Sequence, residues 1–163
     1  MRAADKVRPR EAIAGTIAAQ RTARGPVVFT NGVFDLLHIG HVRYLEFARA
    51  LGGMLVVGVN SDASVRSLAK GPQRPIIPEA ERAEVVAALA CVDYVCVFDE
   101  QRPDATIRAL RPDIHVKSAH YAVDDLPEAA AVAEVGGRIV LAPHEAGAST
   151  TDIVRRIQRS FPA

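Results

Sequence analysis

Short apolar runs that alternate with longer helical segments are the feature of this 163-residue chain that most constrains its fold. The runs are nearly continuous in apolar residues, which indicates strands that are buried on both faces. Strands are expected at 27–29, 54–59, 93–98, 113–116 and 138–141. Helices are expected between them, at 41–51, 78–90, 102–110 and 126–135, after a first helix at 10–24.

This alternation predicts a Rossmann-like α/β fold: a doubly wound, parallel, five-stranded sheet with helices on both faces. Hydrophobic residues make up 49% of the chain and charged residues 24%, so the chain can fill one core. We expect a single domain over residues 1–163, with an N-terminal helix and lead-in at 1–25 and a catalytic core at 26–160. In such folds, ligands bind beyond the carboxyl ends of the strands.

Net charge and cysteine content narrow the classes of partner. The formal net charge is +1, and acidic residues are interspersed among the arginines, so we expect no nucleic-acid partner. No apolar stretch approaches the roughly 20 residues of a membrane span, and no secretory signal is visible, so a cytoplasmic protein without a membrane partner is expected. Cys91 and Cys96 have the spacing of neither a metal site nor a redox pair, and both are expected to be reduced core residues.

Two histidines that bracket a glycine lie just after the first predicted strand, where a helix is expected to begin. His38 and His41 are three residues apart, so both side chains can face the same side of a first helical turn. Gly40 lies between them, and its lack of a Cβ lets a ligand approach the backbone. A helix N-terminus attracts anions, and an imidazole can donate a hydrogen bond or carry a positive charge near neutral pH. The run therefore predicts a binding site for a phosphate chain. The alternative is that one histidine caps the helix and the other fills a gap in the core.

A second helix N-terminus is predicted near the end of the chain. Ser149, Thr150, Thr151 and Asp152 precede an apolar series at 153, 154 and 157, which has the form of a capping box before an amphipathic helix. Ser149 is expected to cap this helix. The amides and hydroxyls beside it could also hold phosphates.

The motifs resemble those of a known enzyme family. Thr30-Asn31-Gly32-Val33-Phe34-Asp35 followed by His38-Ile39-Gly40-His41 resembles the signature of the cytidylyltransferase-like nucleotidyltransferase superfamily. Within it, the chain is similar to the heptose-1-phosphate adenylyltransferases, which occur alone or fused to a sugar kinase. That narrower resemblance rests on Val59-Asn60-Ser61-Asp62, Arg74-Pro75, Pro78, Glu81-Arg82 and Ser149-Thr150-Thr151 with Ile153. It runs from about Val27 to Gln158.

The resemblance implies transfer of AMP from ATP to heptose 1-phosphate, which gives ADP-heptose and pyrophosphate for bacterial surface glycans. Such a transfer depends mainly on alignment and charge neutralisation, and no covalent enzyme intermediate is expected. Mg²⁺ would come with the nucleotide phosphates, and no metal site held by the protein is expected. A homodimer is expected because two-fold dimers are the commonest oligomers.

Two alternative functions stay open from the sequence. One is a cytidylyltransferase that acts on glycerol 3-phosphate or another small phosphate alcohol. The other is a non-catalytic nucleotide-binding regulatory module, because a fold by itself does not grant activity.

The resemblance also implies roles for individual residues. His38, His41 and Lys117 are the expected catalytic residues. The expected nucleotide-binding residues are Thr30, Asn31, Gly32, Phe34, His38, Gly40, His41, Lys117, Ser149, Thr150, Thr151 and Arg155. The expected acceptor-binding residues are Asp35, Asp62, Lys70, Arg74 and Arg82.

Each acceptor-binding assignment has a competing interpretation. Asp35 and Asp62 could steady loops through hydrogen bonds or contact sugar hydroxyls. Lys70 and Arg74 lie in a turn-rich loop that suits closure over a sugar phosphate, or that is only a solvated connector. Arg82 could support the site or form an ordinary surface ion pair.

The segment after the fourth predicted strand departs from the heptose enzymes. Lys117 is present at the end of that strand, but Ser118 and Ala119 replace two glycines and His120 replaces an acidic residue. If the backbone there needed a positive φ, the side chains at 118 and 119 would strain it. The departure bears on the contacts with the nucleotide or the sugar.

Overall fold

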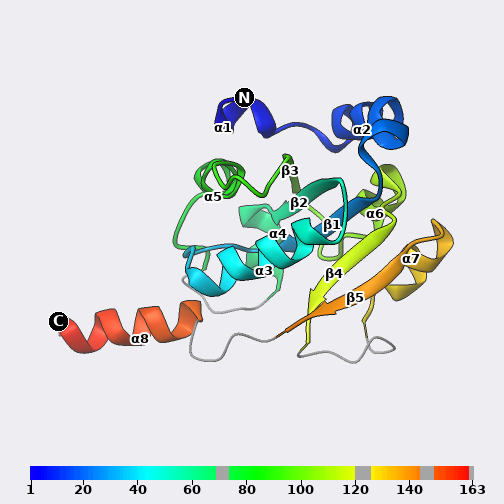
Figure 1. The fold of residues 1–163 in the computed structure, drawn as a ribbon. Coiled ribbons are helices and arrows are strands. Elements are labelled where there is room, and N and C mark those ends of the chain that lie inside the picture. The colour runs from blue at the N-terminus through cyan, green and yellow to red at the C-terminus, as the bar shows by residue number, and fades with distance from the viewer. Residues whose placement is uncertain (69–73, 120–125, 144–148, 162–163) are drawn as a thin grey trace.

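Five parallel strands form the centre of the protein, as the alternating pattern predicts. The computed structural model describes residues 1–68, 74–119, 126–143 and 149–161. Its strands are β1 (Val27–Gly32), β2 (Met54–Asn60), β3 (Tyr94–Phe98), β4 (Ile114–Ser118) and β5 (Arg138–Ala142). They are ordered β3-β2-β1-β4-β5, and each pair of neighbours is parallel (Figure 1). This is the predicted doubly wound, Rossmann-like order.

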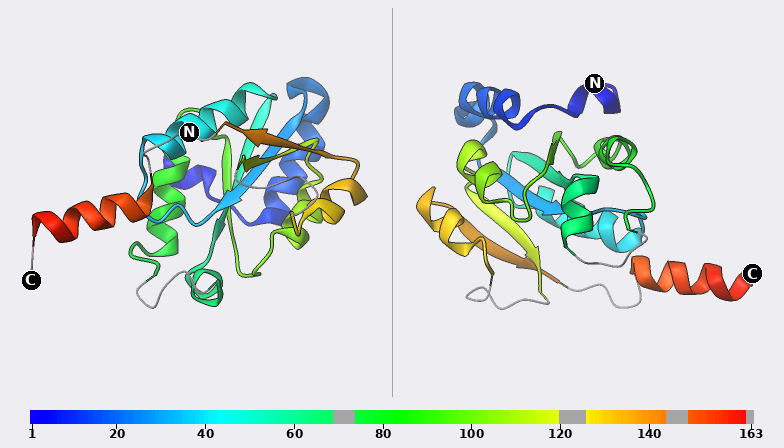
Figure 2. Two further views of the ribbon diagram at one scale, coloured as in Figure 1. Left: turned by 90° about the horizontal axis from the view of Figure 1, so that it is seen from below. Right: turned by 180° about the vertical axis from the view of Figure 1, so that it is seen from behind.

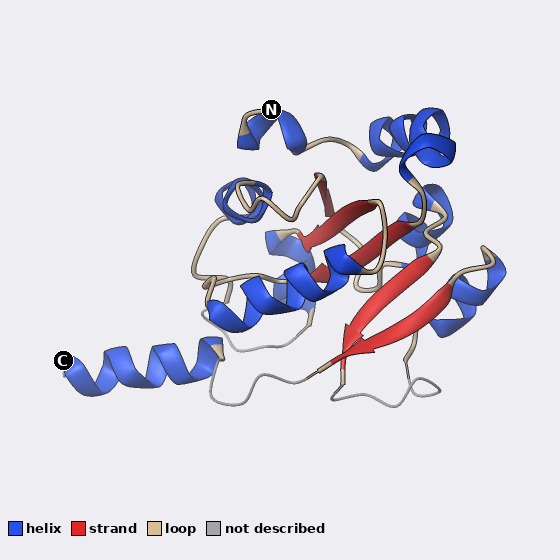
Figure 3. Cartoon of the chain, viewed as in Figure 1, coloured by secondary structure: helices blue, strands red, loops and turns tan. Residues whose placement is uncertain are grey.

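Helices cover both faces of the sheet, as expected (Figure 3). They are α1 (Ala3–Lys6), α2 (Arg10–Arg24), α3 (Ile39–Ala50), α4 (Asp62–Ser67), α5 (Glu79–Ala87), α6 (Asp104–Leu110), α7 (Ala129–Glu134) and α8 (Thr150–Ser160). Apolar side chains of α1, α3 and α5 pack on one face, and those of α2, α6 and α7 pack on the other. The four residues of α1 and the six of α4 are too few to show a helical period, so the sequence pattern did not predict these helices.

Successive residues of the central strands belong to two different buried clusters, which explains why these strands are apolar along most of their length. Val28 of β1 and Leu55 of β2 face the cluster that contains Leu45 of α3. Phe29, the next residue of β1, faces the cluster that contains Ile13 of α2. Because side chains of a strand alternate between its faces, a sheet covered on both faces needs apolar residues at every position.

The winding of the chain changes sides between β1 and β4. From β1, the chain passes through α3 to β2 and through α5 to β3 on one face of the sheet. It then passes through α6 to β4 and through α7 to β5 on the other face (Figure 2). The carboxyl ends of β1 and β4 therefore lie side by side, with connections that leave toward opposite faces. Ligands of doubly wound proteins bind at this position.

The two ends of the chain lie differently against the sheet. The lead-in at 1–25 contributes to both layers, because α1 packs on α5 and α2 packs on α6. By contrast, no residue of α8 is buried, and this helix extends away from the sheet (Figures 1 and 2). Ser149 caps α8 as predicted, since its side chain accepts a hydrogen bond from the backbone N–H of Asp152 at 3.0 Å.

Both cysteines are free thiols, as predicted. Cys96 is buried and Cys91 is half-buried, and burial raises the pKa of the Cys96 thiol to about 12. Among the described residues, no helix is both long enough and apolar enough to cross a membrane.

Candidate active site

A cavity of about 690 Å³ opens at the carboxyl ends of β1 and β4. Its walls come from the turn between β1 and α3, the loop between β3 and α6, the residues before α7 and the N-terminus of α8. The lining residues are Asn31, Gly32, Val33, Phe34, His38, Gly40, His41, Tyr44, Asn60, Leu68, Gln101, Arg102, Pro103, Lys117, Ser118, Leu126, Pro127, Glu128, Pro143, Ser149 and Thr150. The cavity therefore brings together most of the residues that the sequence assigns to nucleotide binding.

His38 and His41 lie side by side on the wall formed by the β1–α3 turn. The imidazole rings stack with their centroids 3.9 Å apart and 28° between their planes. The carbonyl of His38 accepts a hydrogen bond from the N–H of His41 at 2.9 Å, so the backbone fixes the pair at the start of α3. The side chain of His38 makes no capping hydrogen bond, which argues against its being only a helix cap. Nδ1 of each ring is buried and has no hydrogen-bond partner among the described residues.

Burial favours the neutral form of both histidines in this structure. Burial, and after it the charge of the neighbouring His38, lowers the pKa of His41 from 6.5 to about 4. Burial also lowers the pKa of His38 below 6.5. A neutral imidazole keeps one N–H, so each ring can still donate one hydrogen bond to an anion.

Phe34 packs inside the β1–α3 turn. Its φ is +50°, a left-handed conformation that is unusual for a bulky residue, and its side chain is buried. The ring lies 5.2 Å from the ring of His41, between centroids. A Cβ on Gly32 would lie 3.0 Å from the Phe34 ring, so the glycine makes room for it. Phe34 thus supports His41, and its predicted contact with nucleotide stays a prediction.

Lys117 reaches the cavity from the end of β4. Its Nζ lies 2.9 Å from Oε1 of Glu128 and 3.5 Å from Oδ1 of Asn31 on β1. These residues are far apart in the sequence and meet because β1 and β4 are neighbours in the sheet. Ser118 continues β4, and neither Ser118 nor Ala119 has a positive φ. The residues that replace the family's two glycines are therefore accommodated without backbone strain.

Ser149 and Thr150 bring the N-terminus of α8 to the cavity. The Ser149 hydroxyl accepts from the Asp152 backbone and also donates to Oδ2 of Asp152 at 2.7 Å. Thr151 and Arg155 are exposed and do not belong to the cavity lining. The Arg155 guanidinium lies 3.7 Å from Oδ1 of Asp152. The structure thus places part of the predicted phosphate-binding segment at the cavity and part of it away from the cavity.

Thr30 lies beneath the cavity and not in its wall. Its side chain is fully buried, and Oγ1 is 2.6 Å from the Tyr44 hydroxyl and donates to the carbonyl of Val116 at 3.0 Å. The Tyr44 hydroxyl also donates to that carbonyl, at 2.8 Å. In this structure, the Thr30 hydroxyl therefore joins β1, α3 and β4 instead of facing the nucleotide site.

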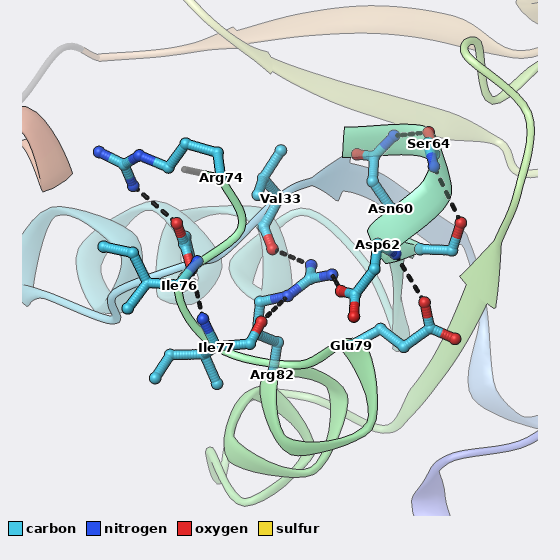
Figure 4. Close-up of polar contacts among 11 residues, drawn as sticks. Val33, Asn60, Asp62, Ser64, Arg74, Ile76, Ile77, Glu79 and Arg82 are labelled. Carbon is cyan, nitrogen blue, oxygen red and sulfur yellow. Dashed lines mark hydrogen bonds and ion pairs between the residues drawn. The ribbon is translucent and has the colours of Figure 1, made fainter. Parts of the chain in front are cut away.

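Asp35 anchors the segment before α5 to the β1–α3 turn by accepting hydrogen bonds from Arg74, Ile76 and Ile77, which Figure 4 labels. Its carboxylate is 2% exposed; Oδ1 accepts from the N–H groups of Ile76 (2.8 Å) and Ile77 (2.9 Å), and Oδ2 accepts from Arg74 (2.7 Å). Burial alone would raise the pKa of the Asp35 carboxyl, but the hydrogen bonds from Ile77, Arg74 and Ile76 outweigh it and hold the pKa below its ordinary value. Of the two roles that the sequence left open, Asp35 performs the one of steadying the loop.

Arg82 completes this arrangement from α5, and its side chain is fully buried (Figure 4). Nε donates to the carbonyl of Ile77 at 2.8 Å, Nη1 to the carbonyl of Val33 at 2.5 Å, and Nη2 to Oδ1 of Asp62 at 2.7 Å. The Asp62 backbone N–H donates to Glu79 at 2.6 Å. Arg82 therefore joins three segments that surround the cavity, and the alternative of a surface ion pair is wrong.

The described acceptor-binding candidates contact one another and do not line the cavity. Asp62 and Arg74 keep 27% and 20% of their side chains exposed. Asp35 and Arg82 are buried, and their charged groups bond to neighbouring loops. Their contact with the acceptor stays a prediction. Lys70 lies outside the described residues.

Several cavity residues escaped the sequence reasoning. Gln101 and Arg102 lie between β3 and α6, Glu128 precedes α7, and Tyr44 lies on α3. Arg102 is half-exposed and pairs with Asp104 at 2.8 Å. Loops that follow the carboxyl ends of strands were expected to form the site. Nothing in the sequence singled out these particular side chains.

The groups that face the cavity suit an anion. They include two imidazoles, an ammonium group, and the hydroxyls of Ser149 and Thr150 at a helix N-terminus. In the part of the chain that the structure describes, no three histidine, cysteine or acidic side chains gather as a metal site would require. This set of donors fits phosphate oxygens.

Known proteins are similar to this chain along most of its length. A 50% identical relative, the "Bifunctional protein HldE" of Trichlorobacter lovleyi, aligns over 156 residues, which are 96% of this chain and 32% of the relative. The chain spans about a third of the length of the bifunctional relatives that it matches. The "D-beta-D-heptose 1-phosphate adenylyltransferase" of Bordetella bronchiseptica is 48% identical over 154 residues, 94% of each chain.

A solved structure and a family model extend the comparison to fold and family. The lipopolysaccharide core biosynthesis protein from Thermoplasma volcanium superposes with a TM-score of 0.61 and 28% identity, over 74% of this chain and 96% of the other. The model of the Cytidylyltransferase-like family matches residues 29–156, which contain the stacked histidines and Lys117. The chain therefore belongs to the cytidylyltransferase-like family.

Proposed function

We propose that this protein transfers the adenylyl group of ATP to heptose 1-phosphate and releases ADP-heptose and pyrophosphate. The observation that carries the proposal is the stacked pair of His38 and His41, which shares one cavity with Lys117 and the N-terminus of α8. The names of the relatives, including a heptose 1-phosphate adenylyltransferase that aligns along 94% of its length, support the choice of acceptor.

The proposed reaction is a direct displacement. A phosphate oxygen of the acceptor forms a bond to the α-phosphorus of ATP, and the bond from that phosphorus to the bridging oxygen of pyrophosphate breaks. His38 and His41 donate hydrogen bonds to phosphate oxygens, and Lys117 adds a positive charge beside them. Ser149 and Thr150 hold the far end of the triphosphate with the amides of α8. Alignment and charge stabilisation account for the catalysis.

Recognition of the acceptor is proposed to involve the edge of the cavity near the Asp35–Arg82 loops. Asp62, Arg74 and Lys70 are the proposed contacts, while Asp35 and Arg82 hold the loop in place. Arg102 lines the cavity with a half-exposed guanidinium, so it is a further candidate for the phosphate of the acceptor.

Mg²⁺ is proposed to enter with the nucleotide. A metal ion there would be held by phosphate oxygens and water, because the Glu128 carboxylate of the lining is bonded to Lys117 and His115. When bound, it would neutralise charge on the triphosphate. Residues 26–160 are proposed to act as one catalytic core, with 1–25 as its packed lead-in, and the cytoplasm is proposed as the site of the reaction.

A homodimer is proposed, with α8 of one copy seated on α5 of the other. Ile153, Val154 and Ile157 form an apolar stripe on α8, and Ile157 is 50% exposed. The rest of the helix is basic, with arginines at 155, 156 and 159. The outer face of α5 is complementary: it exposes Glu81, Glu84 and Val85. The side chain of Val85 is 49% exposed, and a second copy that covers it would explain an apolar residue at this position.

A pyrophosphate-release assay with ATP and CTP against a panel of phosphate acceptors tests the proposed function. Release that depends on ATP and heptose 1-phosphate supports it. Release with CTP and glycerol 3-phosphate would assign the chain to the cytidylyltransferases. Calorimetric binding of nucleotide without turnover on any acceptor would assign it to the non-catalytic modules.

A further inference from the structure

Glu128 is a buried carboxylate in the wall of a cavity that is otherwise suited to anions. Its side chain is 4% exposed, and it belongs to the lining beside Lys117. An isolated carboxylate in this position would be costly to bury and would repel a triphosphate. Its presence therefore needs an explanation in terms of what it holds.

Two basic side chains of β4 meet at a single oxygen of Glu128. Nζ of Lys117 lies 2.9 Å from Oε1, and Nε2 of His115 lies 3.3 Å from the same atom. His115 and Lys117 are two residues apart on one strand, so both project from the same face of the sheet. Burial would raise the pKa of Glu128, but the hydrogen bonds from His115 and Lys117 lower it to about 2. The carboxylate is thus fully ionised at neutral pH.

His115 acts in this group as a neutral donor. The side chain of His115 is fully buried. Its ring stacks on the ring of Phe29, with the two centroids 5.4 Å apart. Burial lowers its pKa below 6.5, although the bond to Glu128 opposes this. Nδ1 is buried without a hydrogen-bond partner among the described residues. We therefore assign the proton to Nε2, from which it is donated to Glu128.

We propose that Glu128, supported by His115, is a positioning residue that holds the ammonium group of Lys117 at the phosphate end of the cavity, next to Asn31. The group of three carries no net charge, since Glu128 cancels Lys117 and His115 is neutral. The Glu128 carboxylate thus reduces the long-range attraction between Lys117 and the nucleotide, and it fixes the position of the Lys117 ammonium group. The inference rests on the proposed function, because it assumes that Lys117 contacts the nucleotide phosphates.

A charge effect and a positioning effect have opposite signs in the variant Glu128→Gln. If Glu128 only added negative charge, its removal would strengthen binding of a triphosphate. If it positions Lys117, its removal weakens binding, because the amide holds the ammonium group less firmly. Glu128→Asp separates the two effects further: it keeps the charge but withdraws the carboxylate from Lys117.

Calorimetric titration with α,β-methylene ATP tests the proposal through a double-mutant cycle of Glu128→Gln and Lys117→Met. We expect Glu128→Gln to weaken binding about tenfold in the wild-type background and not to weaken it once Lys117 is replaced, where removal of the unpaired carboxylate leaves binding equal or tighter. Glu128→Asp should also weaken binding about tenfold, and it carries the test if Glu128→Gln fails to fold. Thermal unfolding of each variant, followed by circular dichroism, reports on folding separately.

Unchanged or tighter binding in Glu128→Gln, or an equal loss in the Lys117→Met background, would overturn the positioning role. Such a result with an active wild-type enzyme would leave the proposed function intact. If the wild-type protein binds no α,β-methylene ATP and releases no pyrophosphate, the proposed function itself fails, and the positioning role fails with it.

Discussion

At the scale of single residues, the stacked histidines show how burial sets the chemistry of a site. His38 and His41 have adjacent rings and depressed pKa values, so they serve as neutral donors before the nucleotide binds. Two positive charges 3.9 Å apart would repel each other strongly in a partly buried wall. The site therefore gains neutral hydrogen-bond donors from this pair, and the ammonium group beside them belongs to Lys117, which is paired with Glu128.

Replacement of His41 tests the neutral-donor role. His41→Ala should lower kcat by about 10²–10³-fold with the fold intact, as expected when a donor to a developing charge is removed. His41→Gln keeps a neutral N–H near the position of Nε2, so it should retain more activity than His41→Ala. Steady-state kinetics of both variants provide the measurement. Near-normal activity in His41→Ala, or equal losses in the two variants, would contradict the assigned role.

The low pKa of His41 also predicts how stability depends on pH. Between pH 6.5 and about 4, the unfolded chain binds a proton at this position and the folded chain does not. The free energy of unfolding should therefore fall as the pH is lowered through this window. Glu128, with a folded pKa of about 2 against 4.5, adds a separate loss only below about pH 4.5.

Urea unfolding at pH 7 and pH 5 measures the contribution of His41. In His41→Gln, which cannot titrate, the difference in unfolding free energy between the two pH values should be smaller than in the wild type. His115 remains in both proteins and cancels in the comparison. An unchanged difference would show that His41 is not held neutral.

At the scale of elements, the loops around the cavity depend on buried polar contacts. Arg82 joins the β1–α3 turn, the segment before α5 and the start of α4 through three hydrogen bonds. Arg82→Met should lower the free energy of unfolding by about 3 kcal/mol, because it leaves two partly buried carbonyls and the Asp62 carboxylate without their donor. Arg66→Met, a matched change at an exposed position of α4, should alter it by less than about 0.5 kcal/mol. Equal effects in chemical denaturation would contradict this role of Arg82.

The exposed stripe of α8 carries the prediction of a dimer. Ile157→Glu places a charge in the proposed contact with α5, so it should shift the protein from dimer to monomer. Ala19→Glu makes an equal change on the exposed side of α2 and should leave the oligomeric state unchanged. Analytical ultracentrifugation distinguishes the two states. A wild-type monomer, or a dimer that survives Ile157→Glu, would rule out this interface.

The sequence predicted elements whose signal is local and missed features that depend on distant neighbours. The strands were predicted because burial on both faces makes them continuously apolar, and the His38–His41 turn because its residues are consecutive. Glu128 could not be found, since it lies just before α7 and meets Lys117 of β4 only in the folded protein. Arg82 was assigned to the acceptor from the resemblance, and its burial could not be predicted, because its three hydrogen-bond acceptors come from segments that only the fold brings together.

At the scale of the whole molecule, the strand order explains why these parts form one site. The change of winding between β1 and β4 places the stacked histidines and Lys117 in the wall of one cavity. That cavity has a volume of about 690 Å³, and residues of α8 and of the β3–α6 loop also line it. The family match covers the same region. We propose that this cavity binds ATP and heptose 1-phosphate together.

One competition experiment tests that claim most directly. Wild-type protein is incubated with equal concentrations of ATP and CTP, heptose 1-phosphate and Mg²⁺, and the sugar nucleotide is identified by mass spectrometry. We predict ADP-heptose as the dominant product, with pyrophosphate formed in equal amount. CDP-heptose as the main product, or no sugar nucleotide at all, would contradict the account.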